Sequence, residues 1–224
     1  MPATPVTIEI PDMGAVSGLW QAPEAPSACL ALAHGAGAGM DHRSMAAIAD
    51  GFERLGVATL RYQFPYMEKG GKRPDSPVVA HAAVRAAVAE ARTRIAGLPL
   101  FAGGRSFGAR MTSQAQAIDP LVGVRGLVFF AFPLHPAGKP SITRGEHLAE
   151  VAIPMLFLQG TKDALADLDL LEQTIAGLRR MATLERIAEA DHAFHVPAKT
   201  GRNDSEVLAE VLAFAAGWMA TSTP

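Results

Sequence analysis

The sequence predicts one α/β domain whose mostly parallel, doubly wound sheet is flanked by helices, and two observations lead to this prediction. First, five short runs are apolar without alternation, which is typical of strands buried on both faces of a parallel sheet. Second, helix signals lie between these runs, and alternation of strand and helix at this spacing favours a doubly wound sheet. The five runs are residues 28–33, 57–61, 100–103, 126–130 and 155–159.

Three weaker segments complete the predicted sheet. Residues 6–10 and 17–20 are expected to pair antiparallel or to lie at an edge. Residues 183–187 alternate between apolar and polar side chains, which favours a late edge strand.

Two helices carry clear boundary signals. Ser76 before Pro77 predicts an N-cap with proline at the first helical position, and the Ala-rich stretch behind it is expected to end near Ala96. A second helix is expected over residues 203–219, where Asn203 and Glu206 have the spacing of a capping box. Its apolar stripe consists of Val207, Leu208, Val211, Leu212, Ala215, Trp218 and Met219.

Composition excludes several classes of protein. The chain has 224 residues, of which 49% are hydrophobic and 19% charged, so a disordered chain is excluded. The 20 Lys and Arg residues against 22 Asp and Glu give a net charge of −2, which argues against a nucleic-acid partner. The single cysteine, Cys29, has no second cysteine for an internal disulfide.

The sequence also argues against export and against membrane insertion. Residues 1–14 lack a basic start followed by an apolar run. The longest dense apolar stretch, residues 126–134, is too short to span a bilayer. We therefore expect a soluble, cytoplasmic protein that forms one domain over residues 1–224 and has no membrane partner.

The strongest local signal is the G-x-S-x-G pentapeptide Gly104-Arg105-Ser106-Phe107-Gly108. It stands between a predicted strand and a predicted helix, a setting in which the serine oxygen projects above the sheet at the positive end of the helix. The flanking glycines permit the sharp turn, because side chains there would collide with neighbouring backbone. The alternative is an ordinary tight turn whose serine caps the helix.

A second signal is the loop at residues 33–39, which follows a predicted strand and is almost free of side chains. Such a loop lets backbone N–H groups approach a substrate oxygen, and with Ser106 as nucleophile we expect the amides of Ala36 and Phe107 to form an oxyanion hole. A dinucleotide fingerprint is excluded because Met40 stands where its third glycine would be. We expect His34 to hold this loop by hydrogen bonds.

An acid and a base follow the serine in the order that a Ser-Asp-His triad requires. Asp163 comes directly after the run at 155–159, and His192 comes first after the segment at 183–187. Asp167, Asp169 and His195 are the rivals; the two aspartates are expected within the next helix, and His195 in the loop. The histidines show no H-E-x-x-H or similar ligand spacing, so no metal site is expected. His42 and His147 are expected at the surface.

Side chains after two predicted strands are candidates for the walls of a substrate pocket, with core packing as the equal alternative. Arg105, like Arg110, is a candidate to attract a carboxylated substrate, although structural ion pairs are the more ordinary use of such arginines. The candidate substrate-binding residues are Phe64, Tyr66, Arg105, Phe132 and Leu134.

These motifs together resemble the α/β-hydrolase superfamily, in its compact cap-less branch of predicted hydrolases close to dienelactone-hydrolase-like proteins. The resemblance runs from about residue 28 to residue 215 and implies Ser106 as nucleophile, Asp163 as acid and His192 as base. A departure is Arg105, where many esterases carry a small, aromatic or histidine residue. The motifs are AHGAGAG, GGRSFGAR, FPLHPAGKPSITRGEHL, IPMLFLQGTKD and ADHAFHVP.

We therefore expect a serine hydrolase that cleaves a small ester, thioester or lactone through an acyl-enzyme and needs no cofactor. Residues 133–153, where larger relatives insert a lid, have room for a short helix around Gly145 to Val151 and for no separate cap. The alternatives are a non-catalytic interaction protein that keeps the hydrolase fold, and an acyltransferase or C–C bond hydrolase that uses the same triad. The sequence leaves the substrate and the oligomeric state open.

Overall fold

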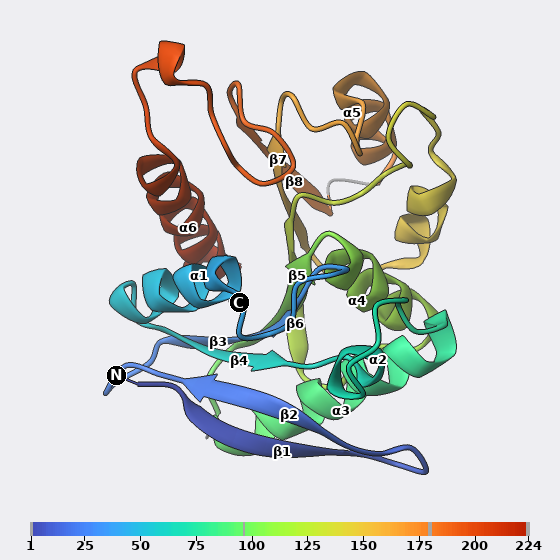
Figure 1. Ribbon diagram of the computed structural model, residues 1–224, viewed down its shortest axis with the longest axis vertical. Coiled ribbons are helices and arrows are strands. Elements are labelled where there is room, and N and C mark those ends of the chain that lie inside the picture. Colours follow the sequence, from blue (N-terminus) through green and yellow to red (C-terminus); the bar gives the residue numbers. More distant parts are fainter. Residues whose placement is uncertain (1, 96, 179–180, 223–224) are drawn as a thin grey trace.

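An eight-stranded sheet forms the centre of the computed structural model, which describes residues 2–95, 97–178 and 181–222. The strand order is β1-β2-β4-β3-β5-β6-β7-β8 (Figure 1). The first two strands pair antiparallel, and from β4 to β8 every neighbouring pair is parallel. The strands are β1 (Thr4–Ile10), β2 (Gly14–Gln21), β3 (Ala28–Ala33), β4 (Val57–Tyr62), β5 (Leu100–Arg105), β6 (Val124–Phe130), β7 (Met155–Gly160) and β8 (Ala182–Ile187).

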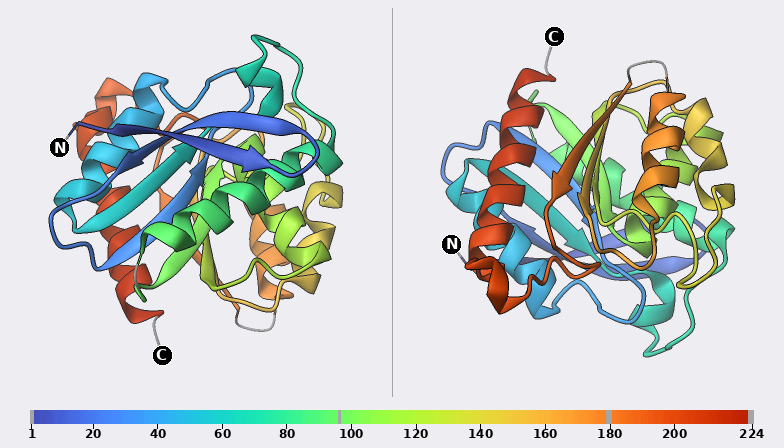
Figure 2. Two further views of the ribbon diagram at one scale, coloured as in Figure 1. Left: turned by 90° about the horizontal axis from the view of Figure 1, so that it is seen from below. Right: turned by 90° about the horizontal axis from the view of Figure 1, so that it is seen from above.

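Helices cover both faces of the sheet (Figures 1 and 2). The helices α1 and α6 lie side by side on one face, and α3, α4 and α5 lie on the other. The α-helices are α1 (Arg43–Arg54), α2 (Pro65–Glu68), α3 (Pro77–Arg94), α4 (Phe107–Ile118), α5 (Leu168–Ala176) and α6 (Asp204–Thr221), and the 3₁₀ helices are η1 (Thr143–Glu150) and η2 (Ala198–Thr200).

This architecture confirms the predicted doubly wound α/β fold. Every residue of β3, β4 and β7 is buried, as expected for strands covered on both faces. The strand β8 ends the sheet at one edge, as its alternating sequence predicts. At the other edge β1 pairs only with β2, in the antiparallel arrangement expected for this region.

The strand β5 is longer than its apolar run predicts. It continues through two glycines to Arg105, which pairs with Phe130 of β6. Glycine is a poor strand former, so the sequence signal stops early. The pairing needs glycine here, because a Cβ atom at Gly103 would lie 1.9 Å from the carbonyl oxygen of Val128.

Both predicted helices with boundary signals are present. The helix α3 begins at Pro77 after Ser76, although the Ser76 side chain makes no capping hydrogen bond. It ends at Arg94, and the expected end near Ala96 lies outside the described residues. The helix α6 begins after Asn203 with the predicted capping box to Glu206.

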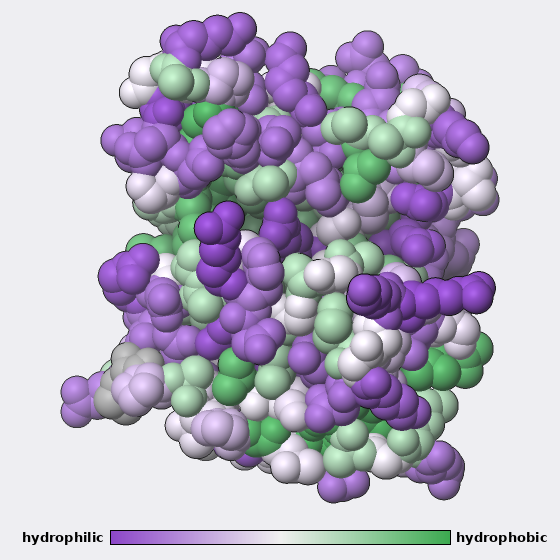
Figure 3. All heavy atoms as spheres, in the orientation of Figure 1, coloured by the Kyte–Doolittle hydropathy of each residue, from purple (hydrophilic) through white to green (hydrophobic). Residues whose placement is uncertain are grey.

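No separate cap covers the described part of the chain, as the sequence predicts. The segment at residues 133–153 contains only the 3₁₀ helix η1. None of the helices in the described ranges combines the length and the apolar composition that crossing a bilayer requires. Hydrophilic residues predominate on the face drawn in Figure 3, with hydrophobic residues in several separate areas between them.

We predict that Gly103→Ala destabilises the protein by about 1–3 kcal/mol or more. The new methyl group would overlap backbone atoms of β6, and rotation of a side chain cannot relieve this overlap. Gly217→Ala is the matched control. A Cβ atom there meets nothing within 4 Å outside the backbone of its own helix, and alanine is the better helix former by about 0.5–1 kcal/mol. Urea denaturation measures both variants, and unchanged stability of Gly103→Ala would refute the packing argument.

Candidate active site

Ser106 occupies a strained turn between β5 and α4. Its backbone has φ 50° and ψ −112°, a conformation that residues with a side chain rarely adopt. Two backbone hydrogen bonds hold the turn: Ser106 N–H donates to Phe130 O at 3.0 Å, and Arg110 N–H donates to Ser106 O at 3.2 Å. Ser106 therefore stands at the carboxyl edge of the sheet and at the N-terminus of α4.

The glycines on either side of this turn allow it to pack closely against β3. A Cβ atom at Gly104 would lie 2.6 Å from Ala33 O, and one at Gly108 would lie 2.6 Å from His34 O. Both contacts are with backbone, so neither can be relieved by moving a side chain. The G-x-S-x-G spacing is thus required by the close approach of β3, β5 and α4.

The structure brings Ser106, Asp163 and His192 into one chain of hydrogen bonds. His192 Nε2 lies 2.8 Å from Ser106 Oγ, and His192 Nδ1 lies 2.7 Å from Asp163 Oδ2. With the imidazole proton on Nδ1, that nitrogen donates to the carboxylate and Nε2 accepts from the serine hydroxyl. This arrangement can activate Ser106 for attack on a carbonyl carbon.

Asp163 is fixed by two further donors, one near the end of β7 and one in the loop that follows it. Gln159 Nε2 donates to Oδ2 at 2.6 Å, and Leu165 N–H donates to Oδ1 at 2.8 Å. The Asp163 side chain is fully buried, whereas the His192 side chain is a quarter exposed. The carboxylate therefore has one orientation, and it presents a single oxygen to the imidazole.

The turn that carries His192 is held by Asp191. The Asp191 side chain accepts hydrogen bonds from Ala193 N–H at 2.7 Å and from His195 N–H at 3.0 Å. On the β7 side, Lys162 N–H donates to Ala190 O at 2.9 Å, which joins the loops of Asp163 and His192. The two loops thus position the acid and the base together.

The rival residues lie apart from this cluster. Asp167 caps α5, where its Oδ1 accepts from Leu170 N–H at 3.0 Å, and Asp169 is exposed on that helix. His195 is exposed and pairs with Asp204, with Nδ1 2.9 Å from Oδ2.

His34 holds the loop after β3, as the sequence predicts. Its Nδ1 donates to Gly35 O at 2.7 Å, and its Nε2 accepts from Phe64 N–H at 3.1 Å. Burial lowers the pKa of His34, which favours the neutral ring that this pair of hydrogen bonds requires. Within the described residues the amides of Ala36 and Phe107 donate to no other group, so both are available to an incoming oxygen.

A cavity of about 220 Å³ lies beside Ser106. Among the expected substrate-binding residues, Arg105 lines it. Phe64, Phe132 and Leu134 are fully buried in the core and do not line it, while the Tyr66 hydroxyl accepts from Gly37 N–H at 3.4 Å. Two further lining residues, Ser44 and Met45, were not among the sequence candidates, because no motif marks the start of α1. The lining residues are Gly35, Ala36, Gly37, Ala38, Ser44, Met45, Arg105, Ser106 and His192.

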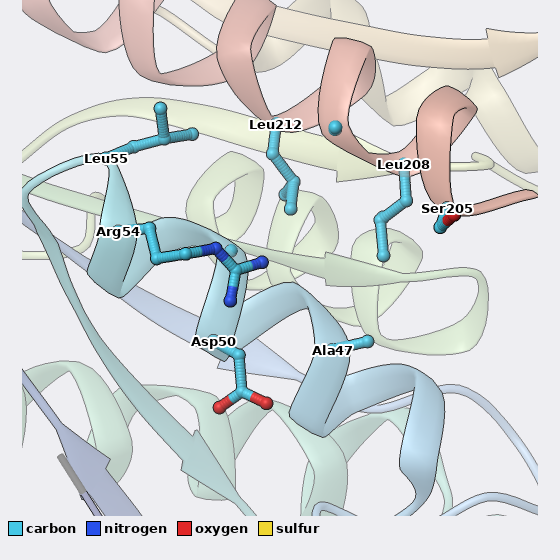
Figure 4. A pocket seen from close by; sticks show the side chains of 9 residues that line it. Ala47, Asp50, Arg54, Leu55, Ser205, Leu208 and Leu212 are labelled. Carbon is cyan, nitrogen blue, oxygen red and sulfur yellow. The ribbon is translucent and has the colours of Figure 1, made fainter.

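A separate cavity of about 320 Å³ lies between α1 and α6 (Figure 4). Arg54 of α1 lies opposite Leu212 of α6, whereas the carboxylate of Asp50 points away from α6. This cavity shares no lining residue with the cavity beside Ser106, and its lining contains no histidine or cysteine. We therefore take the smaller cavity, beside Ser106, as the candidate substrate site.

The comparison with protein families agrees with this fold. Residues 26–220 match the family described as alpha/beta hydrolase domain. The protein therefore belongs to the alpha/beta hydrolase family, and its chain represents the cap-less form of that fold.

Solved structures of similar length share the fold. A serine hydrolase without lid from Xanthomonas campestris has a TM-score of 0.75 at 20% identity, with 97% of this chain and 95% of that chain covered. Dienelactone hydrolase from Anabaena variabilis has a TM-score of 0.74 at 18% identity, with 98% and 97% covered. A protein from Thermus thermophilus has a TM-score of 0.68 at 25% identity, with 98% and 99% covered.

His147 differs from its predicted place at the surface. His42 is exposed and caps α1, but His147 is half-buried, with Nε2 2.7 Å from Ser113 Oγ. Burial, together with the charge of Arg110 and the nearby His81, lowers the pKa of His147 to about 4. No local sequence pattern predicts this burial, because η1 brings His147 against α4 only in the folded chain.

This lowered pKa predicts a loss of stability in acid. Between pH 6.5 and about 4 the unfolded chain protonates His147 while the folded chain does not, so stability falls as the pH falls through this range. His147→Gln should remove that contribution. His195→Gln is the contrasting variant: Asp204 raises the pKa of His195, so its contribution is present below pH 6.5 and is lost at higher pH. Urea denaturation at several pH values measures how the free energy of unfolding changes with pH in each variant. The same pH dependence in the parent and in His147→Gln would contradict the lowered pKa of His147.

Proposed function

We propose that the protein is a serine hydrolase that cleaves a small ester, thioester or lactone through an acyl-enzyme. The observation that carries this proposal is the hydrogen-bonded chain from Ser106 through His192 to Asp163. The strained turn at Ser106 and the uncommitted amides nearby support it further. Other proteins with this fold include a dienelactone hydrolase from Anabaena variabilis and an esterase domain from Rhodothermus marinus, which agrees with the proposal.

In the first half of the reaction, Ser106 Oγ attacks the carbonyl carbon while His192 Nε2 takes its proton. Asp163 holds the imidazole in the required tautomer and stabilises the imidazolium that forms. The amides of Ala36 and Phe107 donate to the developing oxyanion, and the loss of one such donor typically costs about 2.7–4 kcal/mol. His192 then gives its proton to the leaving group, and the acyl group stays on Ser106.

In the second half, water attacks the acyl-enzyme and His192 accepts a proton from it. The tetrahedral intermediate collapses, the acid leaves and Ser106 recovers its proton. No step uses a cofactor or a metal ion. We place this reaction in the cytoplasm and assign it to the chain as a single domain, with a small molecule as substrate.

The first test is covalent labelling with a fluorophosphonate probe. Ser106→Ala should abolish labelling with little loss of stability, because the substitution removes the nucleophile and leaves the packing of the turn unchanged. Ser205→Ala is the control, since Ser205 is an exposed serine at the start of α6, and it should label like the parent. Equal labelling of Ser106→Ala and the parent would refute the proposal and would favour a non-catalytic protein with this fold.

The second test ranks the acid and base against their rivals. His192→Ala should lower turnover of any accepted ester by about 10⁴-fold or more, the typical loss when a triad base is removed. His195→Ala, the matched control, should cost much less, because His195 contacts Asp204 and not Ser106. Asp163→Asn and Asp167→Asn form the second pair, with the larger loss expected for Asp163→Asn. Circular dichroism checks folding, and the reverse ranking in either pair would reassign that role.

A further inference from the structure

Arg105 places a guanidinium group directly beside the proposed nucleophile. It is the last residue of β5, and its side chain lies on the same face of the sheet as Phe101, which packs in the core beneath α1 and α6. The side chain therefore reaches the start of α1, where it contacts Ser44. It lines the same cavity as Ser106 and His192. It is the one residue with a charged side chain in that lining, apart from the titratable imidazole of His192.

Most hydrogen-bonding capacity of Arg105 is unused within the described residues. Its Nη1 donates to Ser44 Oγ at 2.9 Å, and the side chain forms no ion pair with a described carboxylate. None of its nitrogens is both fully buried and without a partner. Since a guanidinium has five N–H donors and Arg105 lines the cavity, donors remain that a ligand there could use.

Arg61 shows how a structural arginine of this protein differs. It is almost fully buried, and its two terminal nitrogens donate to Met40 O at 3.2 Å and to Gln21 Oε1 at 3.1 Å. Both terminal nitrogens of Arg61 therefore hold parts of the fold together, whereas Arg105 is held by one hydroxyl only.

No carboxylate of the described residues forms an ion pair with Arg105. Burial lowers the pKa of Arg105, and the nearby carboxylates of Asp191 and Asp163 oppose this effect without reversing it. Both carboxylates accept hydrogen bonds within their own loops. The helix α1 begins beside the cavity with no acidic residue in its first turn, so its N-terminus adds partial positive charge. Among the described residues, Arg105 therefore supplies the permanent charge of the cavity lining, and no carboxylate lines the cavity.

We propose that this cavity binds the anionic end of a short substrate, with Arg105 forming charge-assisted hydrogen bonds to a carboxylate of the ester that Ser106 attacks. The proposal rests on the proposed hydrolase function and defines its substrate class as small esters that carry a carboxylate. A carboxylate suits the planar donor pattern of a guanidinium better than a neutral group does. The cavity volume of about 220 Å³ suits a short substrate.

Two pairs of esters test this proposal and distinguish the end of the substrate that carries the charge. In the first pair, mono-4-nitrophenyl glutarate has its carboxylate on the acyl side, and its methyl ester is the neutral partner. In the second pair, 4-carboxyphenyl acetate has its carboxylate on the leaving group, and its methyl ester is the neutral partner. Each kcat/KM is divided by the rate constant for hydroxide-catalysed hydrolysis of the same ester, so that leaving-group reactivity cancels.

The parent should prefer the carboxylate in at least one pair by about 10- to 100-fold, the range typical of hydrogen bonds to a charged group. Arg105→Met should lower that preference to near one, chiefly by raising KM for the charged ester. Arg105→Lys should restore part of the preference. Arg43→Met, at an exposed arginine in the first turn of α1, controls for the loss of one positive charge and should keep the preference.

Equal rates within both pairs for the parent, or an equal loss on the charged and neutral esters in Arg105→Met, would overturn the proposal. Calorimetric titration with free glutarate tests the anion site separately from the hydrolase function, because binding of glutarate needs no turnover. Binding that is lost in Arg105→Met, from a protein that hydrolyses no ester, would overturn the proposed function and support the anion site. Hydrolysis of neutral esters without glutarate binding would overturn the anion site alone.

Discussion

The close approach of β3, β5 and α4 at Ser106 is the constraint on which the rest of the site depends. Gly104 and Gly108 meet the backbone of Ala33 and His34 at distances that no side chain tolerates. Between these two glycines the backbone of Ser106 has a positive φ, and its hydroxyl lies at the carboxyl edge of the sheet within hydrogen-bonding distance of His192. Such strain persists only where surrounding structure fixes it, and here the pairing of β5 with β6 and the first turn of α4 do so.

The parallel sheet explains why the other groups meet at this turn. In a parallel sheet the carboxyl ends of neighbouring strands face the same edge, so loops after different strands converge there. The loop after β3 brings Ala36, the loop after β7 brings Asp163, and the loop after β8 brings His192. Hydrogen bonds between and within these loops then fix the orientation of each group, which is the preorganisation that an efficient hydrolase needs.

The sequence predicted the parts of the molecule that follow from local pattern. Apolar runs marked the buried strands, and the order of Ser106, Asp163 and His192 predicted three side chains that the fold brings within hydrogen-bonding distance. Features set by contacts between distant segments were missed. The burial of His147 depends on the packing of η1 against α4, and Phe132 is in the core because neighbouring aromatic rings surround it. Ser44 meets Arg105 across 61 positions of the chain, a contact that no spacing rule predicts.

Rapid-quench mass spectrometry of the acyl-enzyme tests the central claim most directly. The protein is mixed with an activated short ester, quenched in acid within the first turnover and digested. The account predicts that the mass of the acyl group appears on the peptide that contains Ser106, and that His192→Ala accumulates it far more slowly. Product formation by the parent with no acylated peptide, or an acyl group on a different residue, would contradict the account.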